Sequence, residues 1–296
     1  MAGTIPPIEP GPSIEPGLHL IATPIGTARD ITLRALDILR GADVLAAEDT
    51  RSLRRLMALH GIEAGGRDIV AYHDHNGERV RPRLLAALAQ GKSLAYAAEA
   101  GTPMVADPGY QLARAAIAAG HNVRAAPGPS AVLAALTVSG LPSDRFLFAG
   151  FPPSRSSARQ RFIEELARTP ATVILFESPK RVCKTLTELA QNWGAERKAV
   201  LCRELTKRFE TVWRGTLGEL AASCAEQPPR GEVVLVVDRE RPDAQGYART
   251  EARMEEALVE ELETRSLKEA VARVAKETGL PRRTVYQAAL KLAGGR

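Results

Sequence analysis

Five times between residues 18 and 139, a short apolar run is followed by a longer segment whose apolar residues recur at helical spacing. In residues 31–39, for example, Ile31, Ala35 and Ile38 share one face of a helix. Parallel strands that are buried on both faces read as continuous apolar runs, and each needs a crossover to reach its neighbour. The alternation therefore predicts an N-terminal α/β domain over residues 18–139 with a mostly parallel sheet.

A second set of apolar runs begins after Gly150, and two of them, 198–204 and 210–216, are separated by only a few residues. So short a connection favours an antiparallel pair. We therefore expect a second, unlike α/β domain over residues 140–240. Its opening stretch, 149–161, is rich in proline, serine and arginine. We expect this stretch to be a mobile loop. The functional alternative is a basic flap that covers an anionic substrate.

The two ends of the chain differ in pattern from its middle. Residues 1–17 contain five prolines and have little to bury, which predicts a disordered tail. Residues 250–296 lose the strand pattern and read as helices, with a turn at Gly279 and Pro281 at the start of the last helix. We expect a small all-helical domain that binds nucleic acid as a helix–turn–helix does, or else a helical cap whose charges are only solvated.

The composition is that of a globular protein, with 45% hydrophobic and 25% charged residues in a chain of 296, which excludes global disorder. A net charge of +5 favours an anionic partner, whereas only 4% aromatic residues argues against binding single strands through stacked rings. Cys183, Cys202 and Cys224 are expected to be buried thiols in a reducing compartment. Neither a membrane span nor a signal peptide is evident, so we expect a cytoplasmic protein.

Several catalytic motifs are missing from the sequence. It contains no GxGxxG after a strand, no GxxxxGK[ST] and no GxSxG, which excludes dinucleotide-binding, P-loop and serine-hydrolase sites. His73 and His75 would share a face of a strand, and a metal-dependent hydrolase is one alternative that follows from them. Because two ligands do not make a metal site, we predict no metal and interpret residues 73–76 as a polar strand end that faces a substrate.

Small-residue turns directly follow three of the expected strands, at residues 23–26, 101–103 and 127–130. In an open parallel sheet these turns lie on one edge, which is where such sheets bind ligands. Glycine in the turns lets a ligand approach the backbone closely, so a crevice for a nucleoside-sized molecule is expected there. Residues 48–51, Glu-Asp-Thr-Arg, add charge to the same edge, although Asp49 or Thr50 could equally serve as a helix N-cap.

These segments resemble the tetrapyrrole methylase superfamily, whose members consist of two unlike α/β domains with the methyl donor, S-adenosyl-L-methionine, in the cleft between them. Within it the chain is similar to the branch that methylates the 2′-hydroxyl of a decoding-centre cytidine in 16S ribosomal RNA. The matching segments span residues 18–238 and are TPIGTARDITLRAL, AAEDTR, HDHN, AGTPMVADPG, PGPSA, GLPSDRFLFAGFPP, FESPKR, CRELTK and RGEVVLVV. The helical C-terminus also matches this branch.

The resemblance implies which residues bind the donor, largely through their backbone. They come from the turns after three strands of the first domain and from one strand of the second, and are Pro24, Ile25, Gly26, Gly101, Thr102, Pro103, Val105, Ser130, Ala131 and Phe176. The chain departs from the RNA branch at Glu99, Ala98 and Thr27, where Asp, Ser and Asn are usual. An added methylene or a lost hydroxyl at these positions could move a hydrogen bond at the donor site.

For ribose methylation, we expect Glu48 or Asp74 to act as general base and Arg51 to orient the ribose-phosphate, because all three lie on the ligand-binding edge. The residues expected to bind RNA, all basic, are Arg155, Arg159, Lys180, Arg181, Arg203, Arg282 and Arg283. The expected partner is 16S ribosomal RNA or the small ribosomal subunit. The sequence leaves open whether the protein forms a homodimer. The alternatives are methylation of a tetrapyrrole, for which the basic C-terminal helices would have no task, and a non-catalytic RNA-binding module.

Overall fold

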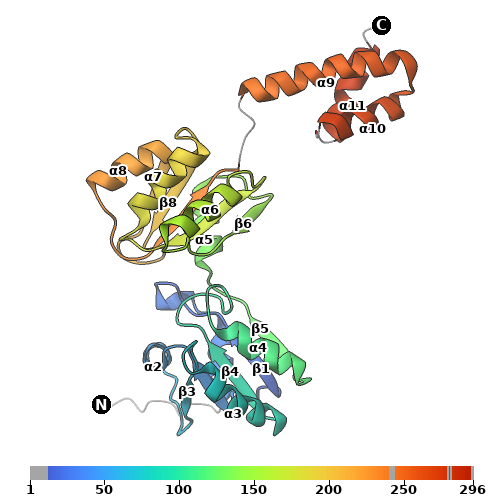
Figure 1. Ribbon diagram of the computed structural model, residues 1–296. Helices are drawn as coiled ribbons and strands as arrows, with labels where there is room; N and C mark the ends of the chain where they lie inside the picture. Colours follow the sequence, from blue (N-terminus) through green and yellow to red (C-terminus); the bar gives the residue numbers. More distant parts are fainter. Residues whose placement is uncertain (1–12, 240–243, 279, 281, 295–296) are drawn as a thin grey trace, which may run out of the picture. The chain divides into compact units, whose positions relative to one another are not determined.

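The computed structural model describes residues 13–239, 244–278, 280 and 282–294 (Figure 1). The chain divides into two compact units, Met1–Arg239 and Glu240–Arg296. Most of the predicted tail, residues 1–12, lies outside the described residues, as do Gly279 and Pro281. None of the helices among the described residues is long and apolar enough to cross a membrane.

The first sheet has five parallel strands in the order β3-β2-β4-β1-β5, as the strand–helix alternation predicts. The strands are β1 (Gly17–Ile21), β2 (Val44–Ala47), β3 (Ile69–Ala71), β4 (Ser93–Ala97) and β5 (Val123–Ala126). The helical segments are η1 (Ala28–Asp30), α1 (Leu33–Gly41), α2 (Thr50–Leu59), α3 (Gly77–Ala89), α4 (Gly109–Ala118) and α5 (Ala131–Ser139). Every crossover therefore returns the chain to the same edge, so all five strands end where the small-residue turns lie.

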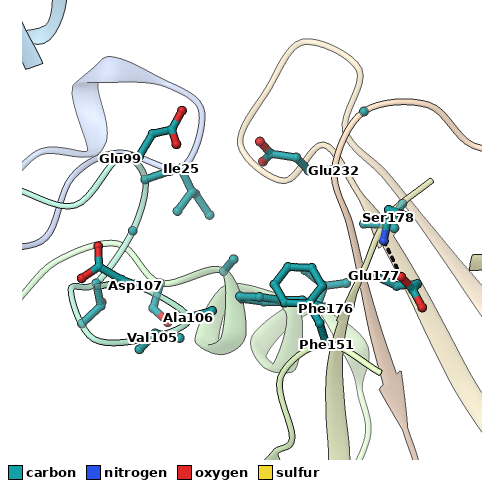
Figure 2. Close-up of a pocket in the computed structure, with 18 of the residues that line it drawn as sticks. Ile25, Glu99, Val105, Ala106, Asp107, Phe151, Phe176, Glu177, Ser178 and Glu232 are labelled. Carbon is teal, nitrogen blue, oxygen red and sulfur yellow. Dashed lines mark hydrogen bonds between the residues drawn. The ribbon is translucent and has the colours of Figure 1, made fainter. Parts of the chain in front are cut away.

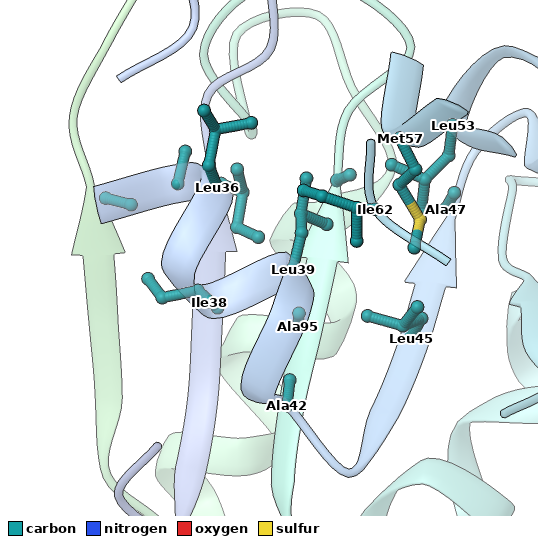
Figure 3. Close-up of a cluster of buried hydrophobic side chains, with 14 of the residues drawn as sticks. Leu36, Ile38, Leu39, Ala42, Leu45, Ala47, Leu53, Met57, Ile62 and Ala95 are labelled. Carbon is teal, nitrogen blue, oxygen red and sulfur yellow. The ribbon is translucent and has the colours of Figure 1, made fainter. Parts of the chain in front are cut away.

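Helices cover both faces of this sheet because successive strand residues point to opposite sides. On one face Leu45 packs with Leu39 of α1 and Met57 of α2 (Figure 3). The next residue along β2, Ala46, belongs instead to the cluster that contains Leu84 of α3 and Leu112 of α4. Both clusters are buried, which holds the strand ends in fixed register at the ligand-binding edge.

The second sheet has the order β6-β7-β10-β8-β9 and mixes parallel and antiparallel pairs. Its strands are β6 (Phe146–Phe148), β7 (Thr172–Glu177), β8 (Lys198–Arg203), β9 (Thr211–Thr216) and β10 (Val233–Val237), and its helices are α6 (Ser156–Leu166), α7 (Val182–Trp193) and α8 (Leu217–Glu226). The expected antiparallel pair is β8 and β9, which confirms the unlike topology of this half. Helix α5 packs through Val132 and Leu136 against Val200 and Val234, so the last helix after the first sheet covers the second.

Two expectations for this half are wrong. Only part of the stretch 149–161 is a loop, because α6 begins at Ser156 and buries Ile163 in the core. Cys183 and Cys224 are joined in a disulfide with a Cα–Cα distance of 5.3 Å, rather than being separate thiols. Helices α7 and α8 pack side by side and thereby bring together cysteines that are 41 residues apart in sequence. Only Cys202 conforms to the expectation, since it is free and buried.

The second unit is a bundle of three helices, α9 (Ala244–Thr264), α10 (Leu267–Thr278) and α11 (Arg282–Gly294). Their core contains Met254, Leu258, Val274 and Val285. The bundle confirms the all-helical C-terminal region predicted from the loss of strand pattern.

Candidate active site

A cavity of about 420 Å³ lies in the first unit at the carboxyl ends of the first sheet's strands and is bordered on the opposite side by residues of the second half (Figure 2). The first-sheet side consists of the turns after β1, β2, β4 and β5. The other side consists of residues that end β7 and begin β10, together with Phe151. The expected crevice at the sheet edge is therefore present as a cavity between the two sheets.

Hydrogen bonds between the turns give the first-sheet side its shape. Thr23 and Gly101 exchange two backbone bonds, of 2.9 Å and 3.0 Å, across an isolated antiparallel bridge. The Thr102 hydroxyl donates to the Pro129 carbonyl at 2.9 Å, which ties the turn after β4 to the turn after β5. Gly101 has a φ of +83°, a conformation that favours glycine. Three separate sequence segments thus form one connected wall.

Most of the residues expected to bind the donor line this cavity. They are Ile25, Gly101, Thr102, Val105, Ser130, Ala131 and Phe176. Pro24, Gly26 and Pro103 are not among the lining residues. Gly26 instead faces the loop after β8, where an added Cβ would lie 2.5 Å from Thr206 Oγ1 and 2.6 Å from Lys207 Cγ. The structure therefore gives Gly26 a packing role between the two halves of the first unit.

The cavity is more acidic than the sequence pattern predicts, because carboxylates from separate segments gather in it. Its five carboxylates are Glu48, Glu99, Asp107, Glu177 and Glu232. Phe151 and Phe176 add an aromatic side, with ring centroids 5.5 Å apart (Figure 2). Asp107 and Glu232 lie inside the segments 100–109 and 230–237 that carry the family resemblance, and this was the signal available for them. An acidic and partly aromatic cavity suits a cationic ligand that has an apolar ring system.

Asp107 is held rigidly and influences its neighbour Glu48. Its carboxylate accepts from the Tyr96 hydroxyl at 3.1 Å and from the backbone N–H of Gly109 at 2.7 Å. Ala106, just before it, has a φ of +56°, so the loop is strained where it meets the cavity. Burial, and secondarily the negative charge of Asp107, raise the pKa of Glu48 to about 6.

The expected catalytic residues do not gather at one point. Glu48 lines the acidic cavity, whereas Asp74 lines a separate cavity of about 230 Å³. The Arg51 side chain is 91% exposed and lines neither. Asp49 accepts from the Arg51 backbone N–H at 2.7 Å and caps α2, which confirms the N-cap alternative for this residue.

The basic residues expected to bind RNA differ in how exposed they are and in whether a carboxylate already pairs with them. Arg159 is only 3% exposed and donates to both carboxylate oxygens of Glu188, at 2.6 Å and 2.9 Å, so it stabilises the fold and is not available to RNA. Arg181 pairs with Glu177 at 2.6 Å and keeps about a third of its side chain exposed. Arg155 and Lys180 are exposed. Arg203 donates through Nε to the Arg230 carbonyl at 2.7 Å, and on α11 both Arg282 and Arg283 are exposed.

Residues 17–221 match the family model of tetrapyrrole (corrin/porphyrin) methylases, and residues 248–293 match the model of the RsmI C-terminal HTH domain. The fold resembles a solved diphthine synthase, with a TM-score of 0.60, 22% identity, and coverage of 75% of this chain and 89% of that chain. It also resembles a uroporphyrin-III C-methyltransferase from Thermus thermophilus complexed with S-adenosyl homocysteine, with a TM-score of 0.52, 21% identity, and coverage of 75% and 97%. The chain belongs to the tetrapyrrole methylases.

Proteins of similar sequence define a narrower family within the tetrapyrrole methylases. A ribosomal RNA small subunit methyltransferase I from Mesorhizobium japonicum is 45% identical over 96% of this chain and 94% of its own length. One from Vibrio cholerae is 41% identical over 96% and 97%. Within the tetrapyrrole methylases, the chain belongs to the family of ribosomal RNA small subunit methyltransferase I.

Proposed function

We propose that this protein transfers a methyl group from S-adenosyl-L-methionine to the ribose 2′-hydroxyl of a decoding-centre cytidine, position 1402, in 16S ribosomal RNA. The observation that carries the proposal is the likeness to ribosomal RNA small subunit methyltransferase I along nearly the whole chain, the C-terminal helical domain included. The substrate is the RNA of the small ribosomal subunit, and the place of action is the cytoplasm. Methylation of a tetrapyrrole is disfavoured because such a ligand gives the C-terminal domain no task.

The acidic cavity fits the donor in charge and in shape. S-adenosyl-L-methionine supplies a methyl group on a positively charged sulfur, and the carboxylates of Glu48, Glu99 and Asp107 provide the matching negative charge. The Gly101 turn leaves the backbone open to a nucleoside, and Phe176 offers an apolar surface to its rings. We therefore propose that this cavity holds the donor in attack geometry, which can supply several kcal/mol of the barrier.

We propose Glu48 as the general base. A ribose hydroxyl is a weak nucleophile, and its proton must leave as the oxygen bonds to carbon. The Glu48 carboxylate lines the donor cavity, and its raised pKa of about 6 makes it a better proton acceptor than an ordinary carboxylate, while leaving it ionised at neutral pH. Asp74 lies in the other cavity and is therefore the weaker candidate for this role.

Basic residues beside the cavity are placed to bind the RNA backbone. Lys180 and Arg181 directly follow the lining residues Ser178 and Pro179, and Lys180 is exposed. We propose that these two, with Arg155 and Arg203, contact phosphates, and that Arg282 and Arg283 of α11 supply a second set of contacts. Arg159 is left out of this surface because Glu188 occupies its guanidinium. Arg51, exposed on α2, remains a candidate for orienting the ribose-phosphate.

The test is methyl transfer to ribosomal RNA. Small subunits from a strain that lacks this gene should accept one labelled methyl group per particle, and mass spectrometry should place it on the ribose of the decoding-centre cytidine. Glu48→Gln should slow single-turnover transfer at saturating donor by about 10²- to 10⁴-fold. Loss of its charge should weaken donor binding in calorimetry by only about two- to fivefold. Absence of transfer by the wild-type protein would refute the function, and a near-normal rate for Glu48→Gln would refute only the base.

A further inference from the structure

A second cavity, of about 230 Å³, lies beside the end of β3 and is lined by polar side chains that the donor site does not use. The residues that matter are Tyr72, His73, Asp74, Glu78, Arg81 and Gln111. We refer to this cavity as the Asp74 pocket. Asp74 and Glu78 are exposed and form no ion pair with any described residue. Both carboxylates are therefore free to accept hydrogen bonds from a ligand in the cavity.

The Asp74 pocket adjoins the proposed donor cavity. Asp107 lines the donor cavity, and the next residue, Pro108, lines the Asp74 pocket. The ring of Tyr72 packs edge-on against Tyr96 with centroids 5.9 Å apart, and the Tyr96 hydroxyl donates to Asp107. The two cavities therefore share a wall formed by two tyrosines and an aspartate.

The order of the strands places the proposed base on the side of the donor cavity that is next to β3, the strand that leads into the Asp74 pocket. Strand β2 lies between β3 and β4 in the sheet, so Glu48, which follows β2, has the Asp74 pocket on one side and Glu99 on the other. Neighbouring strands are about 4.8 Å apart. A nucleotide whose 2′-hydroxyl meets Glu48 therefore has the Asp74 pocket on the β3 side of its ribose, where its base could enter.

The polar groups in the pocket include both donors and acceptors. Arg81 donates through Nε to the Tyr72 hydroxyl at 3.1 Å, and no described residue accepts from its two terminal amino groups. His73 Nδ1 is buried and has no hydrogen-bond partner among the described residues. Gln111 can both donate and accept. The ligand must therefore present acceptors to Arg81 and donors to the carboxylates.

This combination excludes a phosphate and suits a nucleobase. Two carboxylates would repel a phosphate, whereas one arginine is available for carbonyl or ring-nitrogen acceptors. Carboxylates recognise cytosine by accepting from its exocyclic amino group. Uracil presents a carbonyl at the same position, which would leave Asp74 and Glu78 facing an acceptor. A site that hydrogen-bonds an amino group discriminates strongly against a ligand that lacks it.

We propose that the Asp74 pocket holds the base of the target nucleotide and selects cytosine through its amino group, with Asp74 and Glu78 as acceptors and Arg81 as donor. This inference rests on the proposed function, because it assigns the base of the nucleotide whose ribose is methylated. It makes Asp74 a specificity determinant and leaves the proton transfer to Glu48.

The test compares small subunits reconstituted with cytidine at the target position and with its analogue that lacks the exocyclic amino group. Wild-type protein should methylate the cytidine form roughly 10- to 100-fold faster in single-turnover assays. The double variant Asp74→Ala, Glu78→Ala removes both side-chain acceptors and should lose most of that preference through a slower rate on cytidine, while donor binding in calorimetry stays unchanged. Glu63→Ala, which removes an exposed carboxylate outside both cavities, is the matched control and should keep the full preference.

The outcomes separate the two proposals. If wild-type protein methylates neither substrate, the proposed function fails, and this inference fails with it. If the double variant keeps the wild-type preference for cytidine, the function stands and the Asp74 pocket does not read the amino group. Loss of donor binding by the double variant would also overturn the inference, because the pocket would then belong to the donor site. The single variant Glu78→Ala repeats the comparison should the double variant fold poorly.

Discussion

Glu48 shares the acidic cavity with Asp107, and burial, then the negative charge of Asp107, raise the pKa of Glu48. The two carboxylates come from different turns, after β2 and after β4, yet both line the same cavity. Asp107 is fixed by the Tyr96 hydroxyl and two backbone N–H groups, so its charge cannot swing away from Glu48. Burial and the fixed charge of Asp107 together set the pH range in which Glu48 can accept a proton.

We predict that single-turnover methyl transfer rises as the pH is raised through about 6 and levels off near neutrality, because protonated Glu48 cannot accept a proton. Asp107→Asn removes a negative charge and should therefore move the midpoint of this rise to lower pH. Rates measured between pH 5 and 8 check both statements. A profile that is flat over this range in the wild-type protein would exclude Glu48 as the titrating base.

Glu99 faces the same cavity but is exposed, so its charge is screened by solvent. We expect Glu99→Gln to weaken donor binding by about two- to fivefold, as is typical of exposed charge pairs. Glu99→Asp, which restores the residue usual in the family, should bind the donor at least as well as the wild-type protein. Calorimetry with the donor measures both variants, with Glu63→Gln as the control. A loss of more than a hundredfold in Glu99→Gln would show a direct, desolvated contact instead.

Gly26 is expected to be sensitive to any side chain because Thr206 and Lys207 occupy the space beside it. Gly26→Ala should destabilise the first unit by about 1–3 kcal/mol through overpacking. Gly77→Ala is the matched control, since its Cβ would meet no atom closer than 3.4 Å. Chemical denaturation should therefore show a lower midpoint for the first variant only. Equal midpoints would mean that the loop after β8 moves aside freely.

Arg159 and Arg155 provide a contrast between a structural and a surface arginine. Arg159→Met leaves the Glu188 carboxylate without its partner in a largely buried place, so we expect a loss of about 3–5 kcal/mol in the free energy of unfolding. Arg155→Met should leave stability within about 0.5 kcal/mol, because the side chain is exposed. RNA affinity should fall for Arg155→Met, as measured by filter binding at fixed salt. The opposite pattern would place Arg159 at the RNA surface.

The periodicity of apolar residues could predict the strands of the first sheet and the helices that cover it, because each of these elements forms from residues that are close together in sequence. It did not reveal β6, whose sequence Phe-Leu-Phe is apolar but whose three residues are too few to form a recognisable strand pattern. Nor could it assign Arg159, whose partner Glu188 is 29 residues away on another helix. Charge clusters in sequence say nothing about which charges neutralise one another in space.

For the candidate site, the turns that line the donor cavity were predictable from the sequence, whereas the acidic character of the cavity was not. Turn residues such as those at 101–103 are recognisable because glycine and proline serve local backbone geometry. The acidic character arises from five carboxylates on separate segments, of which only Glu48 and Glu99 were expected at the site. Likewise, Gly26 belongs to a predicted turn but packs against Thr206, 180 positions further along the chain.

By itself, the sequence determined the two α/β halves, the helical C-terminus and the edge of the first sheet at which a ligand would bind. These follow from local spacing and from the rule that parallel strands end on one side of a sheet. Only the tertiary structure decided that Glu48 and Asp107 share a cavity, that Asp74 lies in another, and that Cys183 bonds to Cys224. Proximity between distant segments depends on packing, and the energy of a charge or a thiol depends on what packing places beside it.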